Sequence, residues 1–173
     1  MRWRYVGSAL LLCTVPMFAG VLAAIKVNLS DASGKNVGTA FFAQEGNTLR
    51  VYLNLTGLAA GKHGVHIHEG ATCQGQDFKS AGGHLNPGAK QHGFDNKAGH
   101  HAGDFHSSVL VRADGTGFLS FSTSDLSLTH SENSVVGHTI IVDVHEDDQK
   151  TDPDGNSGNG LACGEIPQLK WND

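Results

Sequence analysis

Three histidines, His63, His66 and His68, fall within six residues of one another. If this segment is a β-strand, alternate side chains share a face, so His66 and His68 point the same way. Two neutral imidazoles on one rigid face supply half of a copper, zinc or nickel site. The alternative is a histidine-rich surface strand. Eight more histidines follow, however, and four of them lie between Gly83 and Gly103.

The stretch from Gly70 to Asp104 has no sustained hydrophobic periodicity and is rich in Gly, His, Asn and Asp. A segment of about 35 residues without regular structure is unusual inside a compact domain unless something else orders it. Three histidines and one aspartate make a suitable tetrahedral zinc set. A histidine can serve two metals if both ring nitrogens are deprotonated toward them. A bound metal and a disulfide would order this long segment from Gly70 to Asp104.

The composition favours a β-rich, single-domain protein. The chain has 173 residues, 23 of them glycine, and only 17% are charged. That length fits one domain plus a leader, and the glycine content is typical of many turns and loops. Without residues 1–23, 10 lysines and arginines face 17 acidic residues, a net charge near −7 with neutral histidine. This charge and the lack of a basic patch argue against nucleic acid as a partner.

The N-terminus reads as an export signal. A basic start at Arg2 and Arg4 precedes an apolar run from Val6 to Ala24. The small residues around Ala23 predict cleavage after Ala23, which makes 1–23 the signal peptide and 24–173 the mature domain. Two rival interpretations remain: an uncleaved membrane anchor, and a lipid-modified start at Cys13. Cleavage would leave no membrane segment, and the mature protein would be periplasmic or extracellular.

Cysteine usage agrees with export. Only Cys73 and Cys163 remain after cleavage, and an even pair in an exported chain predicts one disulfide. Closing a loop of about 90 residues stabilises the fold by roughly 4–5 kcal/mol in the chain-entropy model.

Short alternating segments separated by turn residues predict the strands. We expect strands at 24–29, 37–43, 48–55, 108–112, 117–122, 135–144 and 161–169, and a histidine strand between a loop at 57–61 and Gly70. This pattern predicts an all-β fold, an eight-stranded antiparallel sandwich or flattened barrel with two long functional loops.

At this point the chain resembles the copper/zinc superoxide dismutases, especially their exported bacterial-type members, which are Greek-key proteins. The matching motifs run in the family's order and spacing over about 24–166. They are Gly64-Val65-His66-Ile67-His68-Glu69, Gly83-His84-Leu85-Asn86-Pro87, His92-Gly93, His101-Ala102-Gly103-Asp104, Asp147-Asp148 and Leu161-Ala162-Cys163-Gly164.

The resemblance implies a role for each matching residue. Copper ligands are expected at His66, His68 and His84, which are also the catalytic residues. Zinc ligands are expected at His84, His92, His101 and Asp104, so that His84 bridges the two metals. Asp147 matches a carboxylate that hydrogen-bonds ligands of both metals, and His63 matches a histidine beside the copper. Cys73 and Cys163 match the family's disulfide.

The fourth copper ligand departs from the family pattern. The family has a histidine six residues after the glycine that begins the penultimate strand, and here that glycine is Gly137 and Asp143 takes the histidine's place. Counting back four residues from Asp147 gives the same position. His145 lies two residues further on, and a local bulge would let it substitute. Both Asp143 and His145 therefore stand as candidates.

A second departure lies near the disulfide. The family usually has an arginine three residues before the second cysteine, where it guides the anion to copper, and here that residue is Gly160. Lys150, in the polar loop at 146–160, is then the expected source of positive potential. Attraction of an anionic substrate should therefore be weaker.

The resemblance predicts a superoxide dismutase that converts superoxide to oxygen and hydrogen peroxide, with one copper and one zinc per chain and reduced activity. The alternative is a non-catalytic extracytoplasmic copper- and zinc-binding protein on the same scaffold. The expected partner of the dismutase is the superoxide anion. The chain is expected to be either a monomer or a homodimer.

Overall fold

The computed structural model describes residues 21–129 and 131–168. Within them the chain forms nine β-strands and one short 3-10 helix, η1 (Lys79–Ala81). The strands are β1 (Val21–Ser30), β2 (Asn36–Glu45), β3 (Thr48–Leu55), β4 (Gly61–His63), β5 (Val65–His68), β6 (Val109–Val111), β7 (Gly117–Thr123), β8 (Thr139–Asp143) and β9 (Gly160–Glu165). They pair antiparallel in the order β4-β6-β7-β3-β2-β1-β9-β8-β5.

Strand β3 shows why these sequences form a sheet with one buried face. Leu49, Val51 and Leu53 are at most 1% exposed and alternate with residues that stay partly exposed. Side chains with a period of two share one face of a strand, so the apolar set enters the core. Burying each of these side chains contributes roughly 1.5–3 kcal/mol.

The single histidine strand predicted between the loop at 57–61 and Gly70 is split in two at Gly64. Strand β4 pairs with β6, whereas β5 pairs with β8 at the opposite end of the strand order. The backbone of Gly64 joins the two, since its N–H donates to the His145 carbonyl and its carbonyl accepts from Asp143. The sheet is therefore nearly closed into a barrel. The split raises the strand count from the expected eight to nine.

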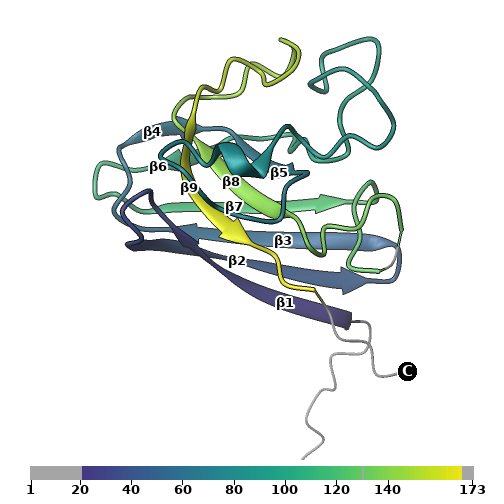
Figure 1. Ribbon diagram of the computed structural model, residues 1–173, viewed down its shortest axis with the longest axis horizontal. Coiled ribbons are helices and arrows are strands. Elements are labelled where there is room, and N and C mark those ends of the chain that lie inside the picture. The colour runs from purple at the N-terminus through teal and green to yellow at the C-terminus, as the bar shows by residue number, and fades with distance from the viewer. Residues whose placement is uncertain (1–20, 130, 169–173) are drawn as a thin grey trace, which may run out of the picture.

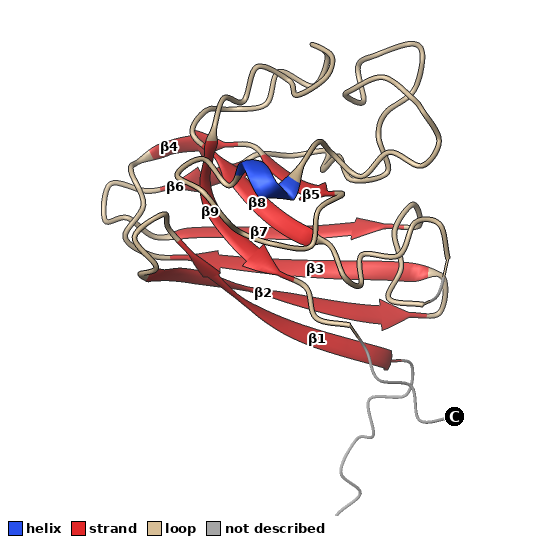
Figure 2. Ribbon diagram, in the orientation of Figure 1, coloured by secondary structure: helices blue, strands red, loops and turns tan. Residues whose placement is uncertain are grey.

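The predicted all-β flattened barrel is confirmed, and Figure 1 shows its strands curling around one core with the long loops gathered on the β5 and β8 side. Figure 2 shows η1 within the first of these loops, close to β5. The largest differences from the predicted strand boundaries are in β8 and β9, each of which is four residues shorter at one end. The strand expected from 135 begins only at Thr139, because Gly137 takes a positive φ of 83° in the turn before it. Strand β9 ends at Glu165.

The predicted disulfide is confirmed between Cys73 and Cys163, whose Cα atoms lie 5.8 Å apart. Cys163 belongs to β9, which pairs with β8, and Cys73 belongs to the first long loop. The bond therefore ties that loop to the barrel.

Most of the predicted signal peptide, 1–23, lies outside the described residues. Strand β1 begins at Val21, so cleavage after Ala23 would remove its first three residues. None of the helices in the described ranges is long and apolar enough to cross a membrane.

Candidate metal centre

Backbone hydrogen bonds to Ile67 place the two halves of the first loop against β5. The Ile67 N–H donates to the carbonyl of Gly103, and its carbonyl accepts from the N–H of Leu85. Isolated bridges consequently pair His66 with Asp104 and His68 with His84. Ile67 is fully buried, so the strand that carries two histidines is also an anchor in the core.

Four ligand atoms surround one point on the loop side of β5. Asp104 Oδ1 lies 2.8 Å from His84 Nδ1, 3.1 Å from His92 Nδ1 and 3.3 Å from His101 Nδ1. The Nδ1 atoms of His84 and His101 are 3.4 Å apart. A tetrahedral ion with ligand bonds of about 2.0 Å requires ligand separations of about 3.3 Å. These four separations within the predicted zinc set lie close to that value.

The state of His92 supports the same interpretation. Its Nδ1 is buried and has no hydrogen-bond partner, although it faces the Asp104 carboxylate. The other ring nitrogen, Nε2, lies 2.9 Å from Asp147 Oδ1, where the N–H donates to the carboxylate. With Nε2 donating to Asp147, Nδ1 is the nitrogen that a cation can bind after displacing the proton that it carries in the metal-free centre. Buried polar atoms without partners are rare, and a cation would satisfy this one.

His68 presents a second unpaired nitrogen on the other side of the centre. Its Nδ1 lies 2.8 Å from the carbonyl oxygen of Gly82, which can only accept, so Nδ1 carries the proton. Its Nε2 therefore has the lone pair, and it is buried without a partner. This is the tautomer that a metal ligand needs.

His84 lies between the two groups. Its ring stacks on that of His66 with centroids 3.9 Å apart, and the ring of His68 is 4.9 Å away. His66, His84, His92 and Asp104 each offer one ligand atom within 4.8 Å of the others. Residues of both predicted metal sites therefore meet around His84.

Asp147 links the two sides from behind. Its Oδ2 accepts a hydrogen bond from His66 Nε2 at 3.0 Å, while its Oδ1 accepts from His92 Nε2. Gln149 holds the carboxylate in turn, because its side-chain amide donates to Oδ2 at 2.6 Å. Carboxylates in this position fix the ring orientation of metal ligands.

The charges of the centre are strongly coupled. Burial alone would lower the pKa of His66, but hydrogen bonds to Asp143 and Asp147 outweigh it and raise the pKa to about 9. Burial would also lower the pKa of His92, but hydrogen bonds to Asp104 and Asp147 outweigh burial and raise this pKa to about 10. Burial and the neighbouring His66 charge hold the pKa of His84 well below its ordinary value. The metal-free centre thus stores protons that a cation must displace.

Of the two candidates for the fourth copper position, the structure brings Asp143 into the centre. Its Oδ2 lies 2.8 Å from His66 Nδ1, and the residue is 3% exposed. His145 is exposed, and its backbone is engaged with Gly64 and Ser157. His63 is buried beside them and contacts the backbone of Asp143, because its Nδ1 lies 2.7 Å from that carbonyl oxygen.

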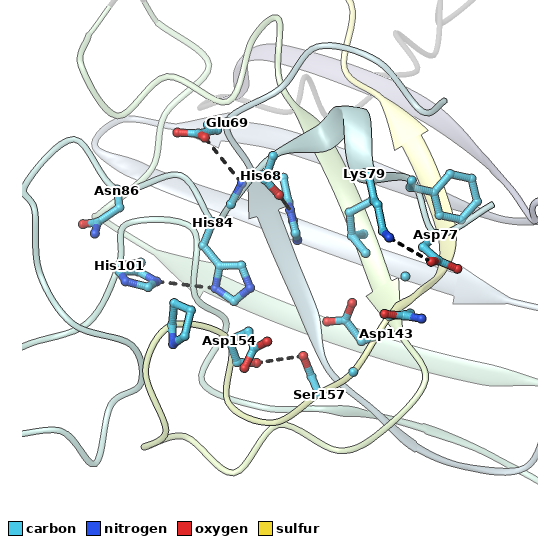
Figure 3. Close-up of a pocket in the computed structure, with 18 of the residues that line it drawn as sticks. His68, Glu69, Asp77, Lys79, His84, Asn86, His101, Asp143, Asp154 and Ser157 are labelled. Atoms are coloured by element: carbon cyan, nitrogen blue, oxygen red, sulfur yellow. Dashed lines mark hydrogen bonds and ion pairs between the residues drawn. The ribbon is translucent and has the colours of Figure 1, made fainter. Parts of the chain in front are cut away.

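A cleft of about 610 Å³ leads to the centre, and His68, His84, His101 and Asp143 are among its lining residues. Figure 3 shows Asp143 and His84 on its floor, with Lys79 and Asp77 on one rim. Gly160 also lines the cleft, but Lys150, the predicted source of positive potential, does not. Lys79 is the lysine that the structure places there.

Two residues of the centre could not be singled out from the sequence. Asp152 Oδ1 accepts the backbone N–H of His92 at 2.7 Å, and Gln149 supports Asp147. Both belong to a polar loop in which many Asp, Asn and Gln residues look alike. Only the folded loop distinguishes them from their neighbours.

Comparisons with known proteins agree with this geometry. The family model described as copper/zinc superoxide dismutase matches residues 36–166. The superoxide dismutase [Cu-Zn] of Deinococcus radiodurans is 40% identical over 153 residues, which is 81% of this chain and 82% of that protein. The superoxide dismutase-like protein YojM of Bacillus subtilis is 36% identical over 146 residues, covering 81% and 74%.

Solved structures give the same result. A crystal structure of a SOD-like protein from Bacillus subtilis matches with a TM-score of 0.77 and 35% identity, covering 82% of this chain and 97% of that one. A single mutant of that protein matches with a TM-score of 0.78 and 36% identity over the same shares. From its motifs, its barrel and its histidine–aspartate centre, the chain belongs to the copper/zinc superoxide dismutase family.

Proposed function

We propose that this protein is a superoxide dismutase of reduced rate, with a zinc ion and a copper ion on either side of His84. Zinc would be held by His84, His92, His101 and Asp104. Copper would be held by His66, His68, His84 and Asp143. The substrate would be superoxide, and the products would be oxygen and hydrogen peroxide.

The observation that supports the proposal is the position of His84 beside both Asp104 and His66. His84 Nδ1 belongs to the group around Asp104 Oδ1, and its ring also stacks on His66. Asp147 accepts one hydrogen bond from each set, from His66 and from His92. This carboxylate therefore connects residues expected at the two metals.

Bound copper would supply one-electron redox chemistry by alternating between two oxidation states, and bound zinc would fix the orientation of the shared ring. The chain's own residues supply the rest. His84 lines the cleft, so a proton held on its Nε2 can be delivered to a reduced substrate there. Asp147 and Gly82 hold the distal nitrogens of His66 and His68. Both rings are thereby kept in the orientation that the reaction needs.

Two features of the chain predict a lower rate. The Asp143 carboxylate is a hard, anionic ligand, which favours copper(II) over copper(I) relative to imidazole. The redox cycle is then less well balanced. Gly160 also supplies no positive charge to the cleft, and an anionic substrate is attracted less strongly.

The second candidate is a non-catalytic copper- and zinc-binding protein. The contact of Asp143 with His66 Nδ1 favours it, because this ion pair lies at the nitrogen that copper would use. The same family scaffold carries the SOD-like protein of Bacillus subtilis, so family membership does not decide between the two.

The disulfide supports an exported protein, because such bonds persist in oxidising compartments. A Caenorhabditis elegans relative, 37% identical over 136 residues, is named an extracellular superoxide dismutase [Cu-Zn]. We place the mature protein outside the cytoplasm, in the periplasm or beyond the cell.

The deciding experiment measures superoxide consumption by mature protein that holds one copper and one zinc per chain. A rate above that of the zinc-only protein, measured with a chelator that silences free copper, supports the dismutase, and Asp143→His should raise it further by restoring imidazole. A rate no better than that of the zinc-only protein, with both metals still bound, would establish the binding protein instead.

A further inference from the structure

The cleft above the centre is lined by acids. Glu69, Asp77 and Asp154 stand around it in addition to Asp143, and Figure 3 shows them on different sides of the opening. Among the described residues that line the cleft, Lys79 is the only lysine or arginine. With Asp143 set aside as a ligand, three acids and one lysine leave two net negative charges.

The single lysine is partly neutralised. Lys79 Nζ lies 3.7 Å from Asp77 Oδ2, and 83% of its side chain is exposed. A Cβ at Gly160, on the cleft wall, would stand 3.0 Å from the Phe78 ring and 3.2 Å from Ile141, so a larger residue there requires these side chains to shift. An apolar ring therefore lies against the position where the family usually has an arginine.

His68 presents an unpaired ring nitrogen at the acidic cleft. His68 lines the cleft, and its buried Nε2 has no hydrogen-bond partner. Negative charge at the entrance and an unpaired acceptor inside together suit a cation and disfavour an anion. A cleft lined by one sign of charge raises the local concentration of the opposite ion.

We propose that the cleft is an entry path for copper(II) ions and that its charge opposes superoxide, so the copper ion is the species this passage recognises. The proposal rests on the proposed copper site at His66, His68, His84 and Asp143. It does not require that the site catalyse anything. The bound ion would neutralise part of the potential that brought it in.

The test uses the mature, zinc-loaded protein and copper(II) sulfate in a non-coordinating buffer at pH 6. The rate of copper uptake is followed by the copper(II) absorption in a stopped-flow instrument. We expect the rate constant to fall as ionic strength rises from about 0.01 M to 0.15 M, because the Debye length shortens from about 30 Å to about 8 Å. Rates that stay constant or rise with salt would overturn the proposal.

Paired variants locate the effect. Asp77→Asn with Asp154→Asn should slow uptake by about three- to tenfold at the lower salt, and Lys79→Gln should accelerate it. Asp95→Asn with Glu132→Gln removes the same charge from residues that do not line the cleft, and should leave the rate within about twofold. Equal slowing in both double variants would show that net charge alone is responsible and would refute the entry path.

The rate of superoxide consumption should depend on ionic strength in the opposite direction to the rate of copper uptake. If the loaded protein consumes superoxide, that rate should rise with ionic strength, because salt screens the repulsion. A superoxide rate that falls with salt would contradict the proposed charge of the cleft. Because copper uptake is measured without superoxide, a protein that proves inactive can still support or refute the entry path.

Discussion

Asp147→Asn tests the coupling within the centre most sharply in the metal-free protein. Asp147 accepts hydrogen bonds from His66 and from His92, and it is 6% exposed. The substitution keeps the shape of the side chain and removes its charge. The wild-type carboxylate should therefore stabilise the protonated form of both histidines, and the variant should not.

The size of the effect follows from the pKa values. The pKa of His66 rises from 6.5 to about 9 against burial, through Asp143 and Asp147 together. At about 1.36 kcal/mol per pKa unit the net shift corresponds to about 3 kcal/mol, and Asp147 is one of the two carboxylates that produce it. The variant also loses the charged hydrogen bond with His92. We expect the variant to be about 2–4 kcal/mol less stable at pH 6.

The sign of the pH dependence is fixed by the direction of these shifts. A histidine whose pKa is raised by folding contributes its full stability below its unfolded value near 6.5, and the contribution disappears as pH rises through the folded value. The folded pKa values are about 9 for His66 and about 10 for His92. The stability difference between wild type and variant should therefore shrink between pH 6 and pH 10.

Urea unfolding of the chelator-treated protein at both pH values measures this difference. Asp148→Asn is the matched control, because Asp148 is a neighbouring acid whose carboxylate bonds Thr151 and Asn156 and no histidine. Its effect should not change between the two pH values. A difference for Asp147→Asn that stays constant or grows with pH would refute the reasoning.

Three further predictions concern the surroundings of the centre. Asp143→Ala should change the absorption spectrum of bound copper(II) and His145→Ala should not, because only Asp143 lies in the centre; the reverse pattern would assign His145 as the ligand. Gly155→Ala should weaken zinc binding about 10- to 100-fold in a chelator competition, since a Cβ there would collide with the Asp147 carboxylate; unchanged affinity would mean that the loop adjusts freely. Replacing both cysteines of the disulfide by serine should lower the free energy of unfolding by about 2–5 kcal/mol, and a smaller loss in urea unfolding would show that the metal-free loop is held by other contacts.

The strands could be predicted from the sequence where one face is buried and the other is wet. Leu49, Val51 and Leu53 alternate with polar residues, and that signal survives without knowledge of the fold. The split at Gly64 could not be predicted, because it depends on two strands from elsewhere in the chain, β6 and β8, that pair on either side of it. Closure of a barrel is a long-range property that local periodicity does not contain.

The centre shows the same division. Histidines and Asp104 stood out because their residue types and spacing are unusual and match a known pattern. Asp152 and Gln149 did not, because nothing in a polar loop marks the one residue whose oxygen meets the N–H of His92. Lys79 was missed for another reason: its place at the cleft depends on the disulfide-tethered loop, which brings η1 next to β9.

The most direct test of two metals sharing one side chain is the metal content and affinity of His84→Gln beside the wild type. The wild-type chain should hold one copper and one zinc, and the variant should bind both ions more weakly, by at least about tenfold each, when each is titrated against a chelator. If only one of the two affinities falls in a variant that remains folded, His84 serves a single ion and the shared centre is wrong.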